Sequence, residues 1–167
     1  MIFVTVGTHE QAFDRLIQHM DQLKEKGDIQ EEVLIQTGFS TYQPQYCKWS
    51  KLFPYKQMIQ HVKNARIVIT HGGPSSFIMP LQVGKIPIVV PRQKQFDEHV
   101  NDHQVEFSKA VAQRQGNIIV VDDICQLGQT IQNYDSIVGT MSTEMTSNNR
   151  RFNEKFEDLV TEMFRAG

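Results

Sequence analysis

The sequence predicts an α/β fold in which a parallel β-sheet is covered by helices on both faces. Short runs of apolar residues alternate along the chain with stretches whose apolar residues recur every three or four positions. The apolar runs are nearly continuous, which is typical of strands that are buried on both faces of a parallel sheet. Glycine, proline or hydroxyl residues follow most of these runs and mark the turns into the next helix.

The first half of the chain predicts four strands. Residues 2–6 form an apolar strand, and residues 33–37 form a second strand that Gly38 ends. Between them, one helical face carries Phe13, Leu16, Ile17, Met20 and Leu23. Residues 41–53 are polar and aromatic, and we interpret them as a long loop with a short strand near residues 51–53. A short helix over residues 55–64 and a strand over residues 67–70 follow.

The second half continues the alternation. A helix follows the glycine-rich turn after residue 70, and a strand over residues 86–90 stops at Pro91. We expect a helix over about residues 97–113, a strand over residues 118–121, and a short helix capped by Asp122 and Asp123. After a polar hinge at residues 139–149, residues 146–167 predict a C-terminal amphipathic helix. Residues 1–167 are thus expected to form a single domain.

The composition narrows the class of protein. Of 167 residues, 40% are hydrophobic and 22% are charged, which is typical of a globular protein with a sizeable core. A formal net charge of −2 gives no indication of a nucleic-acid-binding surface. The distant Cys47 and Cys125 fit a reducing compartment, and no apolar run reaches the ~20 residues that span a bilayer. We expect a cytoplasmic protein that binds no nucleic acid and reaches a membrane only peripherally or through a partner.

The turn after the strand at residues 67–70 predicts an anion-binding site. The strand leads into His71-Gly72-Gly73-Pro74-Ser75-Ser76, and a helical pattern follows. The N-terminus of that helix presents free N–H groups and a partial positive charge, which favour a phosphate. The glycines admit a ligand close to the backbone, while the serines can cap the helix and donate hydroxyls. The alternative is an ordinary strand-to-helix turn capped by serine.

Other loops should join this turn at one edge of the sheet. In parallel α/β sheets, ligands bind outside the carboxyl ends of the strands, at the topological switch point. Residues 7–9, 38–40, 71–76 and 91–95 all follow predicted strands, so we expect them to crowd this edge. Gly7 and Thr8 can offer a backbone N–H and a hydroxyl to a phosphate, and a plain turn accounts for them equally well.

Residues 91–104 carry a dense series of hydrogen-bonding side chains, which is typical of sugar recognition. Arg92 and Lys94 can balance a diphosphate, with arginine the better clamp, and the alternative is a solvated helix N-terminus. His99 and His103 lie four residues apart, a spacing that can bind zinc, but no third ligand is evident and we favour hydrogen bonding. The glycine patterns of dinucleotide and P-loop sites and the Gly-x-Ser-x-Gly elbow of hydrolases are missing.

Three motifs carry a resemblance to a known family when they occur together. They are His-Gly-Gly-Pro-Ser-Ser at residues 71–76, Gly-Lys-Ile-Pro-Ile-Val-Val-Pro-Arg at residues 84–92 and Glu-His-Val-Asn-Asp-His-Gln at residues 98–104. Over about residues 1–121 the chain resembles the C-terminal half of glycosyltransferase family 28. Residues 1–8 are similar to the start of its stand-alone half-enzymes. Among these, it looks like the PssE-type subunits of bacterial capsule and exopolysaccharide synthesis, which are often β-1,4-galactosyltransferases.

This resemblance implies a Rossmann-like domain equivalent to the C-terminal half of a GT-B glycosyltransferase, the half that holds the UDP-sugar. It implies a two-component inverting enzyme that moves a hexose, with Gal favoured, to a lipid-linked saccharide. A separate membrane-associated subunit of PssD type would supply the acceptor half. That partner would hold this chain peripherally at the inner face of the membrane.

The expected roles of the site residues follow from the motifs and the resemblance. For the donor diphosphate we expect Gly7, Thr8, His71, Gly72, Gly73, Pro74, Ser75, Ser76 and Arg92. The resemblance implies Phe53, Tyr55 and Met58 beside the uracil. It also implies that the sugar meets Gln95, Glu98, His99, Asn101, His103 and Gln104.

The expected chemistry needs a base for the acceptor hydroxyl and positive charge for the departing UDP. His9 is the candidate base in this chain, and the alternative is a base in the partner. No Asp-x-Asp motif is present, so we expect no metal and no cofactor. Met79 stands where larger family members commonly carry a Glu that grips the ribose. Two alternatives therefore stay open: a non-catalytic nucleotide-sugar-binding assembly subunit, and a sugar-nucleotide epimerase or hydrolase.

Overall fold

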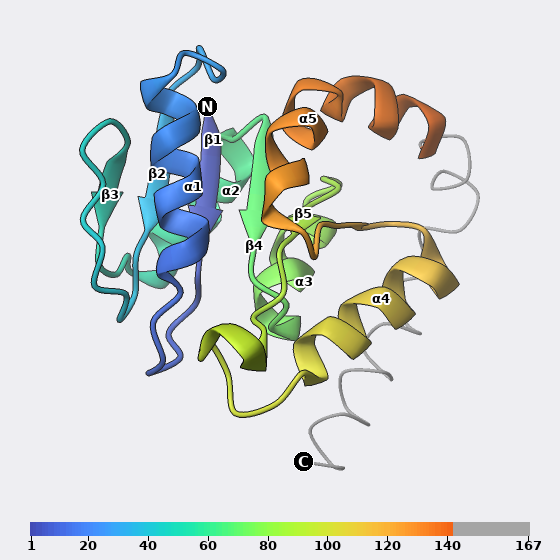
Figure 1. The fold of residues 1–167 in the computed structure, drawn as a ribbon. Helices are drawn as coiled ribbons and strands as arrows, with labels where there is room; N and C mark the ends of the chain where they lie inside the picture. The colour runs from blue at the N-terminus through green and yellow to red at the C-terminus, as the bar shows by residue number, and fades with distance from the viewer. Residues whose placement is uncertain (142–167) are drawn as a thin grey trace.

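Six strands form one all-parallel sheet in residues 1–141, the part of the chain that the structure, a computed structural model, describes (Figure 1). They are β1 (Ile2–Thr5), β2 (Val33–Gln36), β3 (Lys48–Ser50), β4 (Ile67–Thr70), β5 (Ile88–Val89) and β6 (Ile119–Val120). Their order in the sheet is β3-β2-β1-β4-β5-β6. The chain runs outward from β1 to β3 and then returns to form β4 on the other side of β1. The topological switch point therefore lies between the carboxyl ends of β1 and β4.

Helices cover both faces of this sheet. α1 (Asp14–Glu25) and α5 (Leu127–Gln132) lie on one face, and α2 (Tyr55–Asn64), α3 (Pro74–Gln82) and α4 (His103–Gln115) lie on the other (Figure 1). Two short 3-10 helices, η1 (Lys94–Phe96) and η2 (Ile124–Gln126), lie in the loops that flank α4 and β6. The predicted α/β class and parallel sheet are confirmed.

Alternate side chains of β1 pack into the cores on the two faces. Ile2 and Val4 pack with α1 and α5, while Phe3 packs with residues of α2. All three are fully buried, which explains the continuous apolar run of this strand. The register pairs Thr5 of β1 with Thr70 of β4. The loops after these two strands therefore start level with each other at the same edge.

The polar segment after β5 differs from its prediction. The helix expected over residues 97–113 begins only at His103, after η1 and an irregular turn. Asp97 ends η1 in a left-handed conformation with φ 57°, which cannot continue into an α-helix. Asn101 supports the start of α4, because its Oδ1 accepts the His103 N–H at 3.0 Å. His99 thus lies in the turn and does not share a helical face with His103.

The remaining differences concern boundaries. The short strand expected near residues 51–53 lies three residues earlier, where Lys48–Ser50 pair with β2. The strands expected over residues 2–6, 33–37, 86–90 and 118–121 are shorter, whereas α2 and β4 have the predicted bounds. Asp123 caps η2 as expected, since its side chain accepts the Cys125 N–H at 3.0 Å. Residues 139–141 are helical where a hinge was expected, and the C-terminal helix predicted within residues 146–167 lies outside the described residues.

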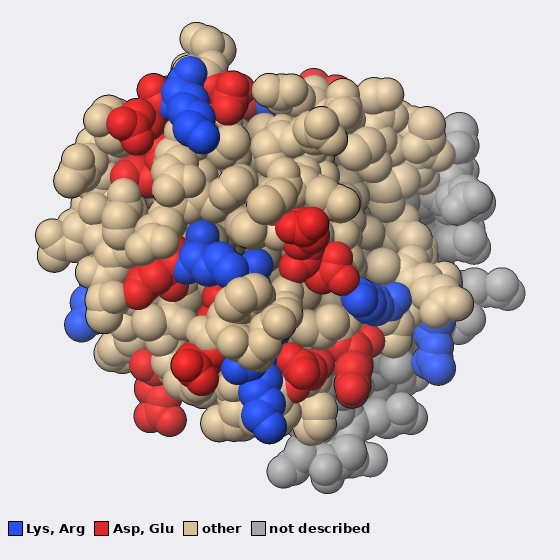
Figure 2. Space-filling model, viewed as in Figure 1, with Lys and Arg blue, Asp and Glu red and all other residues tan. Residues whose placement is uncertain are grey.

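Charges of both signs are interspersed on the face of the molecule that Figure 2 shows. This arrangement agrees with the net charge of −2 and differs from the single-sign surface of a nucleic-acid-binding protein. Within residues 1–141, none of the helices combines the length and apolar character needed to cross a bilayer.

Candidate functional site

A cavity of about 790 Å³ opens at the switch point, beyond the carboxyl ends of β1 and β4. Strand ends, loops and the nearby helices contribute its lining, which is Thr5, Gly7, Thr8, His9, Gln36, Phe53, Tyr55, Met58, Val62, Val68, His71, Pro74, Ser75, Ser76, Ile78, Met79, Gln82 and Gln104. Most residues of the predicted diphosphate set and all three of the predicted uracil set are among them. Of the four loops expected at this edge, residues 7–9 and 71–76 contribute to the lining, whereas residues 38–40 and 91–95 do not.

His71 is buried at the centre of the turn after β4. The Gly73 backbone N–H donates to its Nδ1 at 3.0 Å, so that nitrogen carries no proton. The proton of the neutral ring lies on Nε2, which donates to Ser76 Oγ at 2.7 Å. Burial and then the nearby Arg92 cation lower the pKa of His71 to about 3, so the ring is neutral at physiological pH. Ser76 thus keeps its own hydroxyl proton for another acceptor.

Two glycines leave room for this imidazole. A Cβ added to Gly7 would lie 2.3 Å from His71 Nε2, and one added to Gly73 would lie 2.2 Å from His71 Cε1. Gly7 also has φ +77°, a conformation that other residues rarely adopt. Glycines that were expected to admit a ligand therefore also let the loops after β1 and β4 close around one ring.

The first turn of α3 lines the cavity. Gly73 is the N-cap and Pro74 occupies the first helical position, where its missing N–H is not needed. Ser75 and Ser76 consequently lie inside the first turn and do not cap the helix, contrary to the prediction. Both line the cavity beside the partial positive charge of the helix terminus. This arrangement suits an anion.

Apolar and aromatic side chains line another part of the cavity. Phe53, Tyr55 and Met58, at and just before the start of α2, are the residues predicted to flank a uracil. Met79 of α3 also lines the cavity. The residue that stands in place of the ribose-binding Glu of larger family members is therefore within reach of a ligand. The sequence analysis missed the lining residues Thr5, Gln36, Val62, Val68, Ile78 and Gln82. Of these, only Thr5 and Gln36 could have been identified from the sequence, because they are polar residues at the carboxyl ends of apolar strands.

Arg92 does not line the cavity. Its side chain is buried and donates to the backbone carbonyls of Val6 at 2.7 Å, Gln11 at 2.6 Å and Glu98 at 3.0 Å. Burial lowers the pKa of Arg92 to about 10, so the guanidinium stays charged at neutral pH. These bonds hold its two terminal nitrogens on the loops after β1 and β5, while its buried Nε has no hydrogen-bond partner within residues 1–141. The expected diphosphate clamp is therefore corrected to a structural role.

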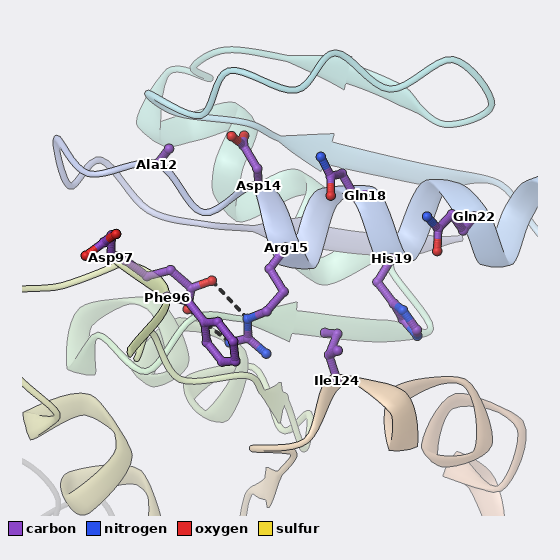
Figure 3. Close-up of a pocket in the computed structure, with 10 residues that line it drawn as sticks. Ala12, Asp14, Arg15, Gln18, His19, Gln22, Phe96, Asp97 and Ile124 are labelled. Carbon is purple, nitrogen blue, oxygen red and sulfur yellow. Dashed lines mark hydrogen bonds and ion pairs between the residues drawn. The ribbon is translucent and has the colours of Figure 1, made fainter. Parts of the chain in front are cut away.

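Glu98 lies beside a second cavity, of about 580 Å³, on the α1 face of the sheet. Its carboxylate accepts from Arg15 Nε at 2.9 Å, from Arg15 Nη2 at 3.0 Å and from the Gln93 N–H at 3.0 Å. Figure 3 shows Arg15 pointing from α1 toward Phe96, whose ring centroid lies 4.5 Å from the guanidinium carbon. Glu98 is only 2% exposed. Its predicted contact with a sugar is therefore corrected to a role in holding the η1 loop on α1.

His9 and His99 stack against each other, with ring centroids 4.6 Å apart and an interplanar angle of 13°. His9 lines the larger cavity, and its Nε2 lies 2.9 Å from Gln11 Oε1. Gln104 lines the cavity too, and its Oε1 accepts the Arg92 N–H at 3.2 Å. The other residues predicted to contact a sugar lie outside the lining, namely Gln95, Asn101 and His103. Of that set, Gln104 lies at the cavity directly and His99 lies behind His9.

The lining of the larger cavity contains no Lys, Arg, Asp or Glu. Its polarity comes from hydroxyls, amides, imidazoles and the terminus of α3. Within the described part of the chain, no group of three or more His, Cys, Asp or Glu side chains is arranged to hold a metal ion. Metal-independent chemistry stays a prediction.

Comparison with known proteins relates the chain to sugar-transferring enzymes. The family model of the glycosyltransferase family 28 C-terminal domain matches residues 1–163. No curated protein matches the sequence.

Three solved structures share the fold. The glycotransferase of kitacinnamycin has a TM-score of 0.61 and 14% identity, over 96% of this chain and 41% of that one. The glycosyltransferase SnogD from Streptomyces nogalater has a TM-score of 0.58 and 13% identity, over 99% and 43%. CalG4, the calicheamicin glycosyltransferase, has a TM-score of 0.58 and 14% identity, over 97% and 43%. The chain thus spans less than half the length of these proteins, and at such identities the likeness shows the fold alone.

Proposed function

Because this chain belongs to the family of the glycosyltransferase family 28 C-terminal domain, we propose that it is the donor-binding half of an inverting glycosyltransferase. Its fold matches the C-terminal half of GT-B glycosyltransferases, and it spans about two fifths of three solved enzymes. A second chain would supply the acceptor half. The observation that carries the proposal is the cavity between the ends of β1 and β4, with the first turn of α3 in its lining.

The cavity suits a nucleotide-sugar. The hydroxyls of Ser75 and Ser76, with the N-terminus of α3, would receive the diphosphate. Phe53 and Tyr55 offer aromatic rings to a uracil. Met79 offers no hydrogen bond to a ribose, so donor affinity would depend mainly on the diphosphate and the base. A UDP-sugar is therefore the proposed donor, and the resemblance to PssE-type subunits favours galactose.

In the proposed reaction, the acceptor hydroxyl attacks the anomeric carbon while a base takes its proton. The bond between that carbon and the β-phosphate oxygen breaks, and its electron pair goes to the departing UDP. The α3 terminus and the Ser76 hydroxyl would stabilise the negative charge that develops there. His71 would align this hydroxyl, because its Nε2–H occupies one lone pair of Ser76 Oγ.

The acceptor would belong to the partner. We expect a lipid-linked saccharide of capsule or exopolysaccharide synthesis, held by a membrane-associated subunit of PssD type. This division would bring the chain to the inner face of the membrane only through its partner. The purified chain alone should bind the donor and transfer little or no sugar.

Calorimetric titration of the purified chain with UDP-galactose, UDP-glucose and UDP-N-acetylglucosamine, with and without magnesium, tests the proposal. We expect binding that does not depend on magnesium, with UDP-galactose the tightest ligand. Ser76→Ala should lower the affinity about tenfold, because it removes one hydrogen bond to a charged ligand. Ser136→Ala is the matched control, since Ser136 is exposed and does not line the cavity. A folded chain that binds none of these ligands would contradict the proposal.

Met79 favours one alternative, a nucleotide-sugar-binding assembly subunit without a catalytic role. This residue lines the cavity where a ribose-binding carboxylate is common in larger family members. Sugar transfer by membranes that contain both subunits separates the two functions. A transferase should lose transfer in Ser76→Ala while the two subunits still associate, and an assembly subunit should not.

A further inference from the structure

The nucleotide cavity has polar groups for a diphosphate but no fixed positive charge. Its lining contains no Lys or Arg, and the buried Arg92, whose terminal nitrogens donate to backbone carbonyls, lies outside it. A UDP-sugar is a dianion, and hydrogen bonds to an anion are stronger when the donor is itself charged. The titratable side chains of the lining are His9, Tyr55 and His71. One of these has to supply any positive charge that the lining gives to the ligand.

His71 does not supply this charge. Both of its ring nitrogens are occupied, one by the Gly73 N–H and the other by Ser76 Oγ. Burial holds the pKa of His71 at about 3, so it stays neutral near pH 7. Tyr55 can only gain a negative charge. Within the lining, His9 is therefore the remaining imidazole, and histidine is the side chain that proteins commonly use to gain a positive charge.

The neighbours of His9 determine which of its ring nitrogens is available to an incoming proton. An amide oxygen only accepts, so the His9 Nε2–H donates to Gln11 Oε1 and Nδ1 is the nitrogen that gains the proton. The ring stacks on His99, whose own Nδ1 accepts the Asn101 N–H at 3.4 Å. Burial, followed by the charges of His9, Arg92 and His103, lowers the pKa of His99. His99 is thus the neutral aromatic partner on which a His9 imidazolium stacks.

The charged groups around this pair are mostly positive or already paired. His71 and Arg92 face it from the ends of β4 and β5, and His103 faces it from the start of α4. The adjacent Glu98 carboxylate is paired with Arg15. Among residues 1–141, the side chain that hydrogen-bonds to His9 and the residue that hydrogen-bonds to His99 are both uncharged. An imidazolium at His9 therefore has no counter-ion until an anion enters the cavity.

The geometry points to a proton-coupled donor site, in which His9, stacked on His99, takes up a proton as the diphosphate of a nucleotide-sugar binds and then pairs with that diphosphate. This inference rests on the proposed function and deepens it. An imidazolium cannot accept the proton of the acceptor hydroxyl. The base of the reaction, for which His9 was the candidate in this chain, is therefore assigned to the partner half.

Calorimetric titration of the full chain with UDP-glucose, in two buffers of different ionisation enthalpy, counts the protons exchanged on binding. UDP-glucose is the probe because its diphosphate, unlike that of free UDP, has no ionisation near neutral pH. Slightly above neutral pH we expect uptake of about one proton. The Kd should also rise with pH, by up to about tenfold per pH unit, because the bound state holds the extra proton.

Two variants and one control locate this proton. His9→Gln should abolish the uptake and flatten the pH dependence of Kd, and His99→Gln should reduce both effects by removing the stacking partner. His19→Gln is the control, since His19 is half-buried in the second cavity on the other face of the sheet. Binding without proton uptake, or uptake that survives in His9→Gln, would overturn the inference and leave the proposed function intact. Failure of the unmodified chain to bind UDP-glucose in either buffer would overturn both.

Discussion

His71 accepts the backbone N–H of Gly73 at 3.0 Å, and its ring lies so close to that glycine that an added Cβ would come within 2.2 Å of Cε1. The turn after β4 is therefore shaped by a side chain of the protein itself. The same ring orients Ser76 Oγ through Nε2. The hydroxyl and the helix terminus are thus arranged before any ligand binds, which reduces the ordering that binding requires.

Gly73→Ala tests this close approach. The backbone at Gly73 has φ −71° and ψ 129°, which alanine adopts readily, so the obstacle is the His71 ring. We expect the free energy of unfolding to fall by about 1–3 kcal/mol from overpacking, together with a loss of UDP-sugar binding. Denaturant unfolding and calorimetry measure the two effects. In Gly139→Ala, the control, the new Cβ meets nothing within 4 Å.

The double variant Gly73→Ala/His71→Ala separates sterics from a general loss of folding. Removal of the ring leaves room for the new methyl group, so part of the lost stability should return while binding stays impaired. Wild-type stability in Gly73→Ala alone would show that the ring yields easily and that the turn is not built around it.

The pH dependence of stability should report the buried neutral imidazole of His71. Its pKa is about 3 in the folded chain, against about 6.5 for an unfolded histidine. Between these values the unfolded chain binds more protons, so this contribution to stability is complete above about pH 6.5 and is lost as the pH falls toward 3. Urea unfolding should therefore show stability declining from about pH 7 to pH 5.

His71→Asn provides the comparison, because asparagine keeps an acceptor for the Gly73 N–H but has no titrating ring. Its stability should change less over the same interval. Asp21 and Glu31 also have lowered pKa values, owing mainly to hydrogen bonds for Asp21 and to Arg66 for Glu31, and they act only at more acidic pH. Parallel curves for the two proteins would contradict a neutral, buried His71.

Local patterns predicted the parts of this molecule that depend on local sequence. The bounds of α2 and β4 follow from apolar periodicity, and the switch-point rule placed His9 and Ser76 at one cavity. The roles of Arg92 and Glu98 were missed because their partners, such as Val6 and Arg15, lie far away in the sequence. Nothing in residues 91–104 alone distinguishes an arginine that faces a ligand from one that holds two loops together.

Arg92→Lys distinguishes these two roles directly. Lysine cannot reach the carbonyls of Val6, Gln11 and Glu98 together, so we expect the free energy of unfolding to fall by about 2–4 kcal/mol. Calorimetric melting measures the change, and Arg114→Lys on the exposed side of α4 should have little effect. A diphosphate clamp would give the opposite pattern, with unchanged melting and weakened binding of UDP-sugars.

Glu98→Gln makes the same distinction for the residue that was expected to contact the sugar. The side chains of Glu98 and Arg15 are 3% and 15% exposed, so loss of the carboxylate leaves a largely buried guanidinium without its counter-ion. We expect the free energy of unfolding to fall by about 1–3 kcal/mol. Lys109→Gln, which breaks an ion pair with Asp122 that is about half exposed, should change it by less than about 1 kcal/mol.

The donor preference of Glu98→Gln supplies the functional readout. Because the carboxylate is committed to Arg15 and to the Gln93 N–H, the order of affinities for UDP-galactose, UDP-glucose and UDP-N-acetylglucosamine should stay as in the unmodified chain. Competitive titration of the three ligands measures that order. If Glu98 instead read a sugar hydroxyl, the order would change while the melting temperature did not, since hydroxyl orientation distinguishes galactose from glucose.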